Sequence, residues 1–206
     1  MAVNRVIFKN NFDIKVSRGF YRYYTLRHST FMYFLVLMGL VSVLYITLGQ
    51  VDMSNTFQAI VIYSVAAVGI VFMPTYTLAS ILSSANRDRK KRGGQVEIYE
   101  VTKDKIERKV EGVPGRNVCS WGSLESVVEA NNAYYFFTNE QEAFTIGKAG
   151  LMEGSLDLMR HLIKNHLPAD KKGKVRFIVK DKAYKKELRE IKKQQKIKAK
   201  ENKAKK

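Results

Sequence analysis

The sequence predicts an α+β membrane protein, in which a two-helix transmembrane hairpin precedes a small antiparallel sheet capped by one C-terminal helix. Three observations lead to this prediction. Two long segments, residues 31–48 and 57–83, are apolar and contain no Asp, Glu, Lys or Arg. Short runs of alternating polarity, joined by turn residues, follow from residue 95 onward. An amphipathic stretch over residues 155–167 then ends at Pro168.

Each apolar segment is long enough to cross a membrane. At about 1.5 Å of rise per residue, helices of these lengths cover a hydrocarbon core of roughly 30 Å. The polar loop between them, residues 49–56, is too short to be a domain, and lipid offers no partner to unpaired backbone groups, so a helical hairpin is expected. Two buried helices in a soluble protein are the alternative, which a chain of 206 residues could hardly cover on every side.

Pro74 marks an irregularity in the second apolar segment. It lacks a backbone N–H and its ring clashes with the carbonyl of Ile70, so a kink is expected between Gly69 and Pro74. The hydroxyls of Thr75 and Thr77 can bond the backbone groups that such a kink frees.

The formal charge of +17 is distributed unevenly along the chain. Residues 95–170 carry eight basic and twelve acidic residues, whereas residues 171–206 carry seventeen basic and four acidic ones. The hairpin has basic flanks and a loop without Lys or Arg, which predicts that both termini are cytoplasmic. Basic flanks and a basic tail favour an anionic membrane surface ahead of nucleic acid as the partner. The residues expected at the membrane surface are Arg18, Arg22, Arg27, Arg87, Arg89, Lys90, Lys91, Arg92, Lys185, Lys186, Lys192 and Lys193.

Residues 1–30 are predicted to hold a strand and an interfacial helix. Residues 5–16 have the period of a half-buried strand, which is seen in the alternation from Phe12 to Val16. Ser17 is placed to cap a helix that starts at Arg18 and runs without a break into the first span. Arginines and aromatic rings mix along this helix, as is typical of the headgroup level of a membrane.

A cytosolic domain is predicted over residues 95–168, after the flexible pair Gly93 and Gly94. Alternating runs, a Pro-Gly turn and an Asn-Asn turn describe five consecutive strands of an antiparallel meander. The amphipathic stretch is expected to pack on the sheet as a helix. This layout is that of a pleckstrin-homology-like (PH-like) domain. Residues 169–206 follow as a basic tail, with a helix from about residue 181 to 200.

The motifs of this domain match those of a known family. They comprise a tryptophan-centred strand, an aromatic strand and the turn before the last helix, with the residues Ser120, Trp121, Leu124, Val127, Glu129, Tyr134, Tyr135, Phe136, Phe137, Phe144, Ile146 and Lys148. Through them the chain resembles the YcxB-like family of bacterial membrane proteins over residues 5–167. The resemblance implies an N-terminal strand, two spans and a cytosolic PH-like domain at the bacterial inner membrane, and it implies no activity. Gly147 stands where the family more often has proline, and Leu151 where an aromatic residue is common.

The sequence contains no pattern typical of a catalytic or metal site. His161 and His166 are five residues apart, which places them on opposite faces of a helix, and Cys119 has no second cysteine with which to share a metal. No glycine-rich phosphate loop of either usual spacing is found. Glu125 and Glu129 could face one side of a strand, where such a pair is usually solvated. We therefore expect a non-enzyme without a cofactor.

Four residues are candidates for ligand binding. Trp121, Tyr134 and Tyr135 could line a groove, although the core is the favoured place for the largest rings of a small domain. Lys148 could contact a phosphate together with backbone donors at the start of the following helix. For Lys148 the favoured expectation is nevertheless a solvated, exposed side chain.

These features predict a non-enzymatic membrane protein whose domain binds a protein, or a lipid headgroup. Membrane lipids with anionic headgroups and a second copy of the chain are further expected partners. One alternative is a membrane-tethered contact with nucleic acid or the ribosome through the basic tail. Another is immunity or resistance to a membrane-active peptide, which only the small hairpin anchor suggests.

Overall fold

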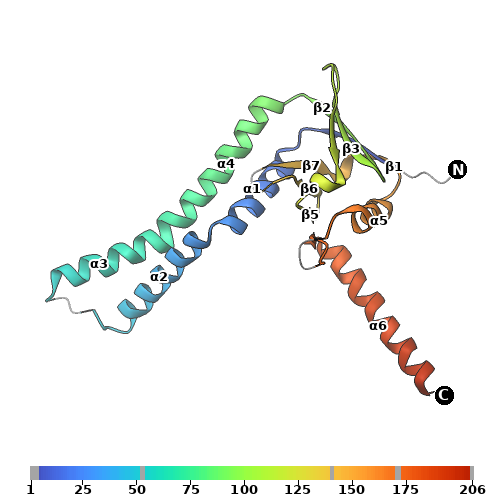
Figure 1. The fold of residues 1–206 in the computed structure, drawn as a ribbon. Helices are drawn as coiled ribbons and strands as arrows, with labels where there is room; N and C mark the ends of the chain where they lie inside the picture. Colours follow the sequence, from blue (N-terminus) through green and yellow to red (C-terminus); the bar gives the residue numbers. More distant parts are fainter. Residues whose placement is uncertain (1–4, 52–53, 140–141, 170–172, 205–206) are drawn as a thin grey trace. The chain divides into compact units, whose positions relative to one another are not determined.

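The structure, a computed structural model, describes residues 5–51, 54–139, 142–169 and 173–204 (Figure 1). The chain divides into two compact units. One combines residues 1–16 with residues 92–206, and the other comprises residues 17–91. We call the first the sheet domain and the second the helical unit.

The first sheet of the sheet domain has the strand order β4-β3-β2-β1-β8. Its strands are β1 (Arg5–Asn11), β2 (Val96–Thr102), β3 (Lys105–Val110), β4 (Asn117–Ser120) and β8 (Leu151–Glu153), and all neighbours are antiparallel. β1 pairs with β2 over its whole length, from Arg5 opposite Thr102 to Asn11 opposite Val96. The first strand of the chain is therefore an inner strand of the sheet.

The second sheet has the order β7-β6-β5-β9. Its strands are β5 (Ser126–Glu129), β6 (Ala133–Phe137), β7 (Ala143–Gly147) and β9 (Phe177–Val179). β9 runs parallel to β5, while the other pairs are antiparallel. The remaining elements are the 3₁₀ turns η2 (Trp121–Ser123) and η3 (Lys148–Gly150) and the helices α5 (Leu156–His166) and α6 (Lys182–Ala204).

Both sheets and α5 contribute to one hydrophobic core. β1 supplies Val6 and Phe8, which are fully buried, because alternate residues of a strand face the same side. α5 supplies Met159, Leu162 and Ile163 from its apolar stripe, and the Ser155 hydroxyl caps the helix by accepting from the Leu158 N–H at 3.0 Å. The predicted combination of antiparallel strands and a packed C-terminal helix is confirmed.

The predicted meander is interrupted at Trp121. Instead of one long strand over residues 118–130, β4 ends at Ser120 and β5 begins at Ser126, in the other sheet. η2 lies between them and turns the Trp121 ring into the core, where its Nε1 donates to the Thr102 carbonyl at 3.0 Å. The five strands that were expected in one meander are therefore divided between the two sheets.

The start of the chain agrees with the sequence prediction only in part. The strand expected over residues 5–16 is present but ends at Asn11, because α1 (Ile14–His28) begins within the alternating residues 12–16. The Asp13 carboxylate accepts from the Lys15 N–H at 2.7 Å, which is the interaction of a helix N-cap. Ser17 is therefore not the cap, and its hydroxyl donates to Asp88 at 2.9 Å instead. The strand itself is β1, and it belongs to the sheet domain.

The helical unit contains one helix that is long and apolar enough to cross a membrane. This helix, Thr56–Arg92, consists of α3 (Thr56–Ala67), the π-helical turn η1 (Val68–Phe72) and α4 (Met73–Arg92). α1 and α2 (Thr30–Thr47) count as a second such helix only if they are taken together, because a bend of 72° separates them. The expected unbroken helix from Arg18 is wrong: Ser29 has non-helical dihedrals, at a His-Ser-Thr run of modest helix propensity.

The irregularity predicted ahead of Pro74 is the π turn η1. A π turn widens the helix by one residue, which relieves the clash of the proline ring with the preceding turn. Thr75 donates its hydroxyl to the Val71 carbonyl at 2.7 Å, and Thr77 donates to the Met73 carbonyl at 2.8 Å. The two hydroxyls therefore bond carbonyls around the irregular turn, as the sequence suggested.

The widened turn lies against α2 through two glycines. A Cβ atom added to Gly39 would lie 2.8 Å from the Gly69 Cα, and one added to Gly69 would lie 2.5 Å from the Leu35 carbonyl oxygen. The two backbones are in direct contact, and only glycine fits at either position. Small residues at this kind of crossing are typical of helices that pack within lipid.

The position of β1 makes a first prediction. A chain in which a short Gly-Ser linker replaces residues 14–93 should fold as a soluble domain, because Asn11 and Val96 lie opposite each other at the end of the sheet. Residues 95–206 alone should not fold, since Val6 and Phe8 would be missing from the core. Circular dichroism and urea unfolding distinguish the two chains. Phe8→Asp in the linked chain is the matched control and should abolish cooperative unfolding. Equal unfolding midpoints with and without β1 would contradict its place in the sheet.

Candidate functional site

Lys148 lies in η3, which directs its side chain into the sheet domain. Its Nζ is 2.7 Å from Glu129 Oε1 and 2.6 Å from Asp181 Oδ2, and its side chain is only 9% exposed. The expected exposed lysine is therefore wrong. Its ammonium group is also held by two carboxylates, which leaves it poorly placed for the phosphate contact that we considered. The pairing could not be read from the sequence, because Asp181 is 33 residues away.

Arg160 of α5 binds the same Glu129. Its Nη2 lies 2.8 Å and its Nε 3.0 Å from Glu129 Oε1, and its Nη1 reaches Asp157 Oδ1 at 2.8 Å. The guanidinium carbon lies 3.6 Å from the centre of the Tyr184 ring, a cation–π contact. We call Glu129, Lys148, Arg160, Asp181 and Tyr184 the ionic cluster.

The ionic cluster joins four segments of the sheet domain: β5, η3, α5 and the first turn of α6. Its two carboxylates and two cations balance in charge. Glu129 is fully buried, and Asp181 and Tyr184 are 8% and 7% exposed. Burial raises the pKa of Asp181, but hydrogen bonds from Lys148 and from the backbone of Tyr184 outweigh it, so this pKa lies below its ordinary value.

The backbone reinforces the docking of the tail. Val127 donates its N–H to the Arg176 carbonyl at 3.0 Å, and the N–H groups of Lys180 and Asp181 both donate to the Glu129 carbonyl, at 2.7 and 3.1 Å. The beginning of the basic tail is thus an edge strand of the second sheet followed by a bound helix start. The sequence placed this segment outside the domain, and the structure places it inside.

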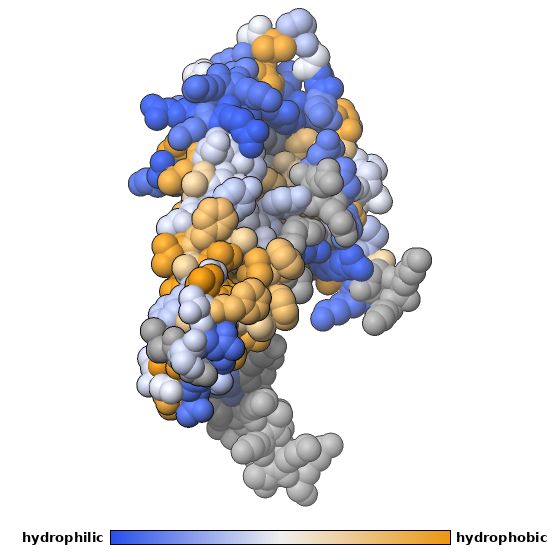
Figure 2. Space-filling model, turned by 90° about the vertical axis from the view of Figure 1, so that its left-hand side faces the viewer, coloured by the Kyte–Doolittle hydropathy of each residue, from blue (hydrophilic) through white to orange (hydrophobic). Residues whose placement is uncertain are grey.

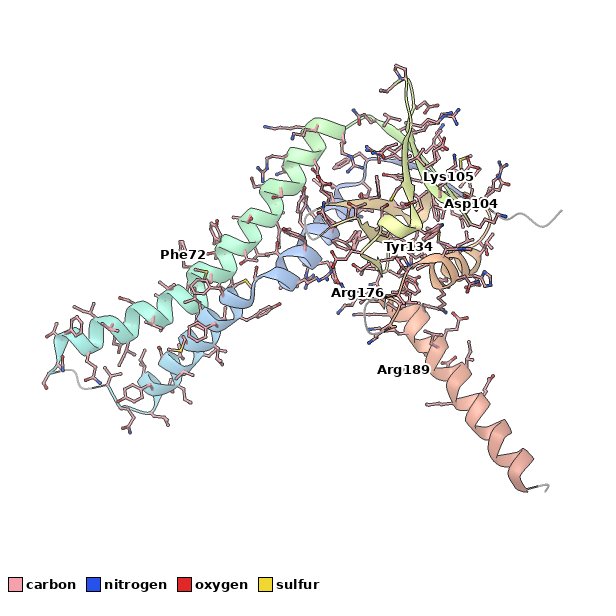
Figure 3. All side chains as sticks on the ribbon, in the orientation of Figure 1. Phe72, Asp104, Lys105, Tyr134, Arg176 and Arg189 are labelled. Carbon is pink, nitrogen blue, oxygen red and sulfur yellow. The ribbon has the colours of Figure 1, made fainter. Side chains whose placement is uncertain are left out.

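The three aromatic candidates are core residues. Trp121 is 5% exposed, Tyr134 is fully buried (Figure 3), and Tyr135 is 1% exposed. Tyr134 donates its hydroxyl to Glu129 at 3.2 Å, and burial raises the pKa of Tyr135 to about 12. The core position favoured from the sequence is the one that these residues occupy. None of them lines an open groove in the described part of the domain.

Glu129 is the residue that sequence reasoning missed. It was paired with Glu125 as a solvated carboxylate, but only Glu125 is partly exposed, at 30%, beside Arg176. The only available signal was that Glu129 ends a strand whose other residues are apolar or small. Its partners Lys148 and Arg160 come from segments 19 and 31 residues further along the chain.

A second buried carboxylate, Glu97 of β2, lies beside the end of α4. Arg92 Nη2 is 2.6 Å from Glu97 Oε2, Tyr99 donates its hydroxyl to the same oxygen at 2.7 Å, and Arg108 pairs with Glu97 Oε1. Burial raises the pKa of Glu97, but these donors hold it below its ordinary value. Arg92 was expected at the membrane surface, and the structure instead shows it half-buried in this ion pair.

The other basic residues predicted at the membrane surface are exposed where the structure describes their side chains. These are Arg18, Arg22, Arg27, Arg87, Arg89, Lys90, Lys91, Lys185, Lys186 and Lys193, while the side chain of Lys192 lies outside the described part. Their exposure leaves them available to solvent or to an anionic surface.

One open depression, of about 410 Å³, lies beside the β3–β4 hairpin. It is lined by Arg108, Val110, Val113, Pro114, Gly115, Arg116, Asn117 and Val118. Val113 and Val118 are more than half exposed, and Arg116, which pairs with Glu107 at 3.2 Å, has a side chain that is 61% exposed. The surface therefore combines apolar side chains with an accessible guanidinium group.

Among the described residues, no three His, Cys, Asp or Glu side chains gather in a way that could hold a metal ion. No family model, no curated protein and no solved structure matches this chain. The resemblance to the YcxB-like family therefore rests on the quoted residues alone.

The burial of Glu129 leads to a second prediction. Glu129→Gln should lower the free energy of unfolding by about 3 to 5 kcal/mol, because it leaves Lys148 and Arg160 with an uncompensated charge in a buried site. Glu125→Gln is the matched control, since its partly exposed ion pair with Arg176 should be worth about 1 kcal/mol or less. Urea unfolding of the full chain in mild detergent measures both changes. Equal losses would show that the ionic cluster is solvated.

A third prediction concerns pH. The pKa of Asp181 is lowered by folding, so its contribution to stability is present above the unfolded pKa of about 3.9 and is lost as the pH falls through the folded pKa. Asp181→Asn should therefore cost about 1 to 3 kcal/mol at neutral pH, and the difference from the wild type should shrink below about pH 4. Asp157→Asn is the control, because Asp157 also binds Arg160 but its side chain is 81% exposed. A difference that stays constant down to pH 3 would rule out this role for Asp181.

Proposed function

We propose that this protein is a non-enzymatic binding protein of the bacterial inner membrane, with two spans that anchor a cytosolic PH-like domain. The observation that carries the proposal is that residues 17–91 interrupt a sheet between its neighbouring strands β1 and β2. Only two residues separate β1 from α1, and only three separate α4 from β2. A chain covers at most about 3.5 Å per residue. The helical unit therefore joins the sheet domain through two short links, as expected of an insertion into that domain.

The exposed apolar side chains of the helical unit support the membrane anchor. Phe31 of α2 and Phe57 of α3 are 70% and 78% exposed, and Figure 2 shows hydrophobic side chains gathered on this part of the surface. In the most apolar stretch of Thr56–Arg92 only 6% of the residues are buried, whereas a core helix of a soluble protein would be mostly buried. A surface of this kind needs a cover. Lipid is the cover that also fits the basic residues flanking the apolar segments.

The order of the strands supports the PH-like fold. β1 to β4 are consecutive neighbours in one sheet, β5 to β7 are consecutive neighbours in the other, and α5 follows. Consecutive antiparallel strands followed by one helix were expected from the sequence, whereas their division between two sheets, the helical unit after the first strand and the strands β8 and β9 were not. The same order agrees with the resemblance to the YcxB-like family.

The pairing of charged side chains supports binding over catalysis. The buried carboxylates Glu97 and Glu129 are each held by cations, so neither is placed as a free acid or base beside a pocket. The open depression at the β3–β4 hairpin offers Val113 and Val118 next to Arg116. Such a surface suits a protein segment that carries apolar and acidic side chains. A lipid headgroup could meet the same arginine and is the second ligand class within this proposal.

The proposed topology gives a fourth prediction. In a Cys119→Ser background, Asn55→Cys should react with an impermeant maleimide added to intact cells, because residue 55 precedes α3 in the proposed external loop. Lys200→Cys should react only after the cells are opened. The chain should also stay in the membrane fraction after alkaline carbonate washing. Labelling of Lys200→Cys in sealed cells would reverse the orientation, and release by carbonate would refute the spans themselves.

A further inference from the structure

The basic residues of α6 are not distributed evenly around the helix. At 100° per residue, nine basic positions fall within a sector of about 120°. These positions are Lys182, Lys185, Lys186, Arg189, Lys192, Lys193, Lys196, Lys200 and Lys203, and we call them the basic face. The acidic residues Glu187 and Glu201 fall outside this sector together with Lys198, and Glu190 flanks it. The positive charge of α6 is therefore concentrated on one side of the helix.

The basic face is long, straight and accessible at the positions that can be checked. From Lys182 to Lys203 it extends over roughly 32 Å at 1.5 Å per residue. Lys182, Lys185, Lys186, Arg189 and Lys193 are all exposed, and Figure 3 shows Arg189 projecting from α6.

The ionic cluster fixes the start of this helix on the sheet domain. Asp181 caps α6 by accepting from the Tyr184 N–H at 3.1 Å while it binds Lys148, and the Tyr184 hydroxyl accepts from Lys164 at 3.1 Å. Asp181 and Tyr184 are buried, whereas Lys182, Lys185 and Lys186 are exposed. The beginning of α6 is thus held in one orientation, which a flexible charged tail would not be.

We propose that the basic face of α6 binds the anionic surface of the membrane that holds the proposed spans. This inference rests on the proposed function, since the spans bring α6 to that membrane. A plane of anionic headgroups contacts a helix along one face, and nine of the ten basic residues of α6 lie on one face. The apolar stripe of Tyr184, Leu188 and Ile191 is too short for deep insertion, because Gln195 and Asn202 continue it. Binding is therefore mainly electrostatic.

The distribution of residues beside the basic face argues against a nucleic-acid groove as the partner. A helix seated in the major groove, about 12 Å wide, has phosphates on both of its flanks. The flanks of the basic face carry Leu188 and Ala199 on one side and Glu190 and Ile197 on the other. Neither flank therefore places a cation beside the phosphates that line the groove.

The test uses the full chain with Cys119→Ser and Gln194→Cys, labelled with a fluorophore. Gln194 is exposed and falls outside the basic face. The chain is reconstituted into phosphatidylcholine vesicles with or without phosphatidylglycerol, each with a quencher on a fraction of the headgroups. We expect quenching only in the anionic vesicles, and we expect it to disappear near 1 M salt, where the Debye length is roughly 3 Å.

Two double variants separate direction from total charge. Lys193→Gln with Lys196→Gln removes two cations from the basic face and should lower the ratio of bound to free α6 by about fivefold for each lysine. Lys180→Gln with Lys198→Gln removes the same charge from two positions outside the basic face and should change the ratio little. Equal losses of binding in the two double variants would show that the total charge, and not the basic face, determines binding.

A further arm offers RNA at the same phosphate concentration as the anionic lipid. If RNA abolishes quenching at physiological salt, the tail is a nucleic-acid arm and the proposal is wrong. Failure of the spans is recognised separately, because the chain would then be released by carbonate. A released chain can still be sedimented with the same vesicles, so the comparison of the two double variants remains decisive in either case.

Discussion

A fully buried carboxylate is the feature on which the construction of the sheet domain depends. Glu129 is fully buried at the end of β5, and an ionised carboxylate in such a place is tolerated only when cations and hydrogen bonds replace its hydration. Lys148 and Arg160 supply the cations, and Tyr134 supplies a hydroxyl. These three partners come from different elements, so their bonds to Glu129 hold η3, α5 and β6 against the end of β5. The second carboxylate, Asp181, then completes the pairing of Lys148 and brings the tail with it.

The same principle operates where the helical unit returns to the sheet. Glu97 of β2 is buried and takes its cations from Arg92, the last residue of α4, and from Arg108 of β3. The glycines that follow Arg92 were expected to be a flexible boundary. In the structure they form a closed turn, in which Gly94 has a φ of 83° and Gln95 donates its N–H to the Arg92 carbonyl at 3.0 Å. Arg92, the last residue of α4, is thus part of the sheet domain.

Local patterns in the sequence predicted the elements whose cause is local. The stripe of α5, the irregular turn before Pro74 and the helix in the tail all follow from residue spacing or from the chemistry of one residue, and all three are found. The partners of Lys148 and the inner position of β1 depend on residues distant in sequence, and no local period encodes them. The alternation over residues 12–16 misled the prediction because one aspartate, Asp13, caps a helix there and outweighs a weak strand pattern.

The inner position of β1 also orders events during synthesis. β1 leaves the ribosome before any residue of the helical unit, and its partner β2 leaves after all of them. The loop that this pairing closes is long, so its closure costs conformational entropy before the contacts between β1 and β2 form. This cost is smaller if α2 and the helix Thr56–Arg92 have already paired, because their pairing shortens the effective loop. On the proposed topology that pairing takes place in lipid. On that topology, completion of the sheet would follow insertion of the helices, and a chain whose β1 stays unpaired would keep an open sheet edge that can pair with other chains.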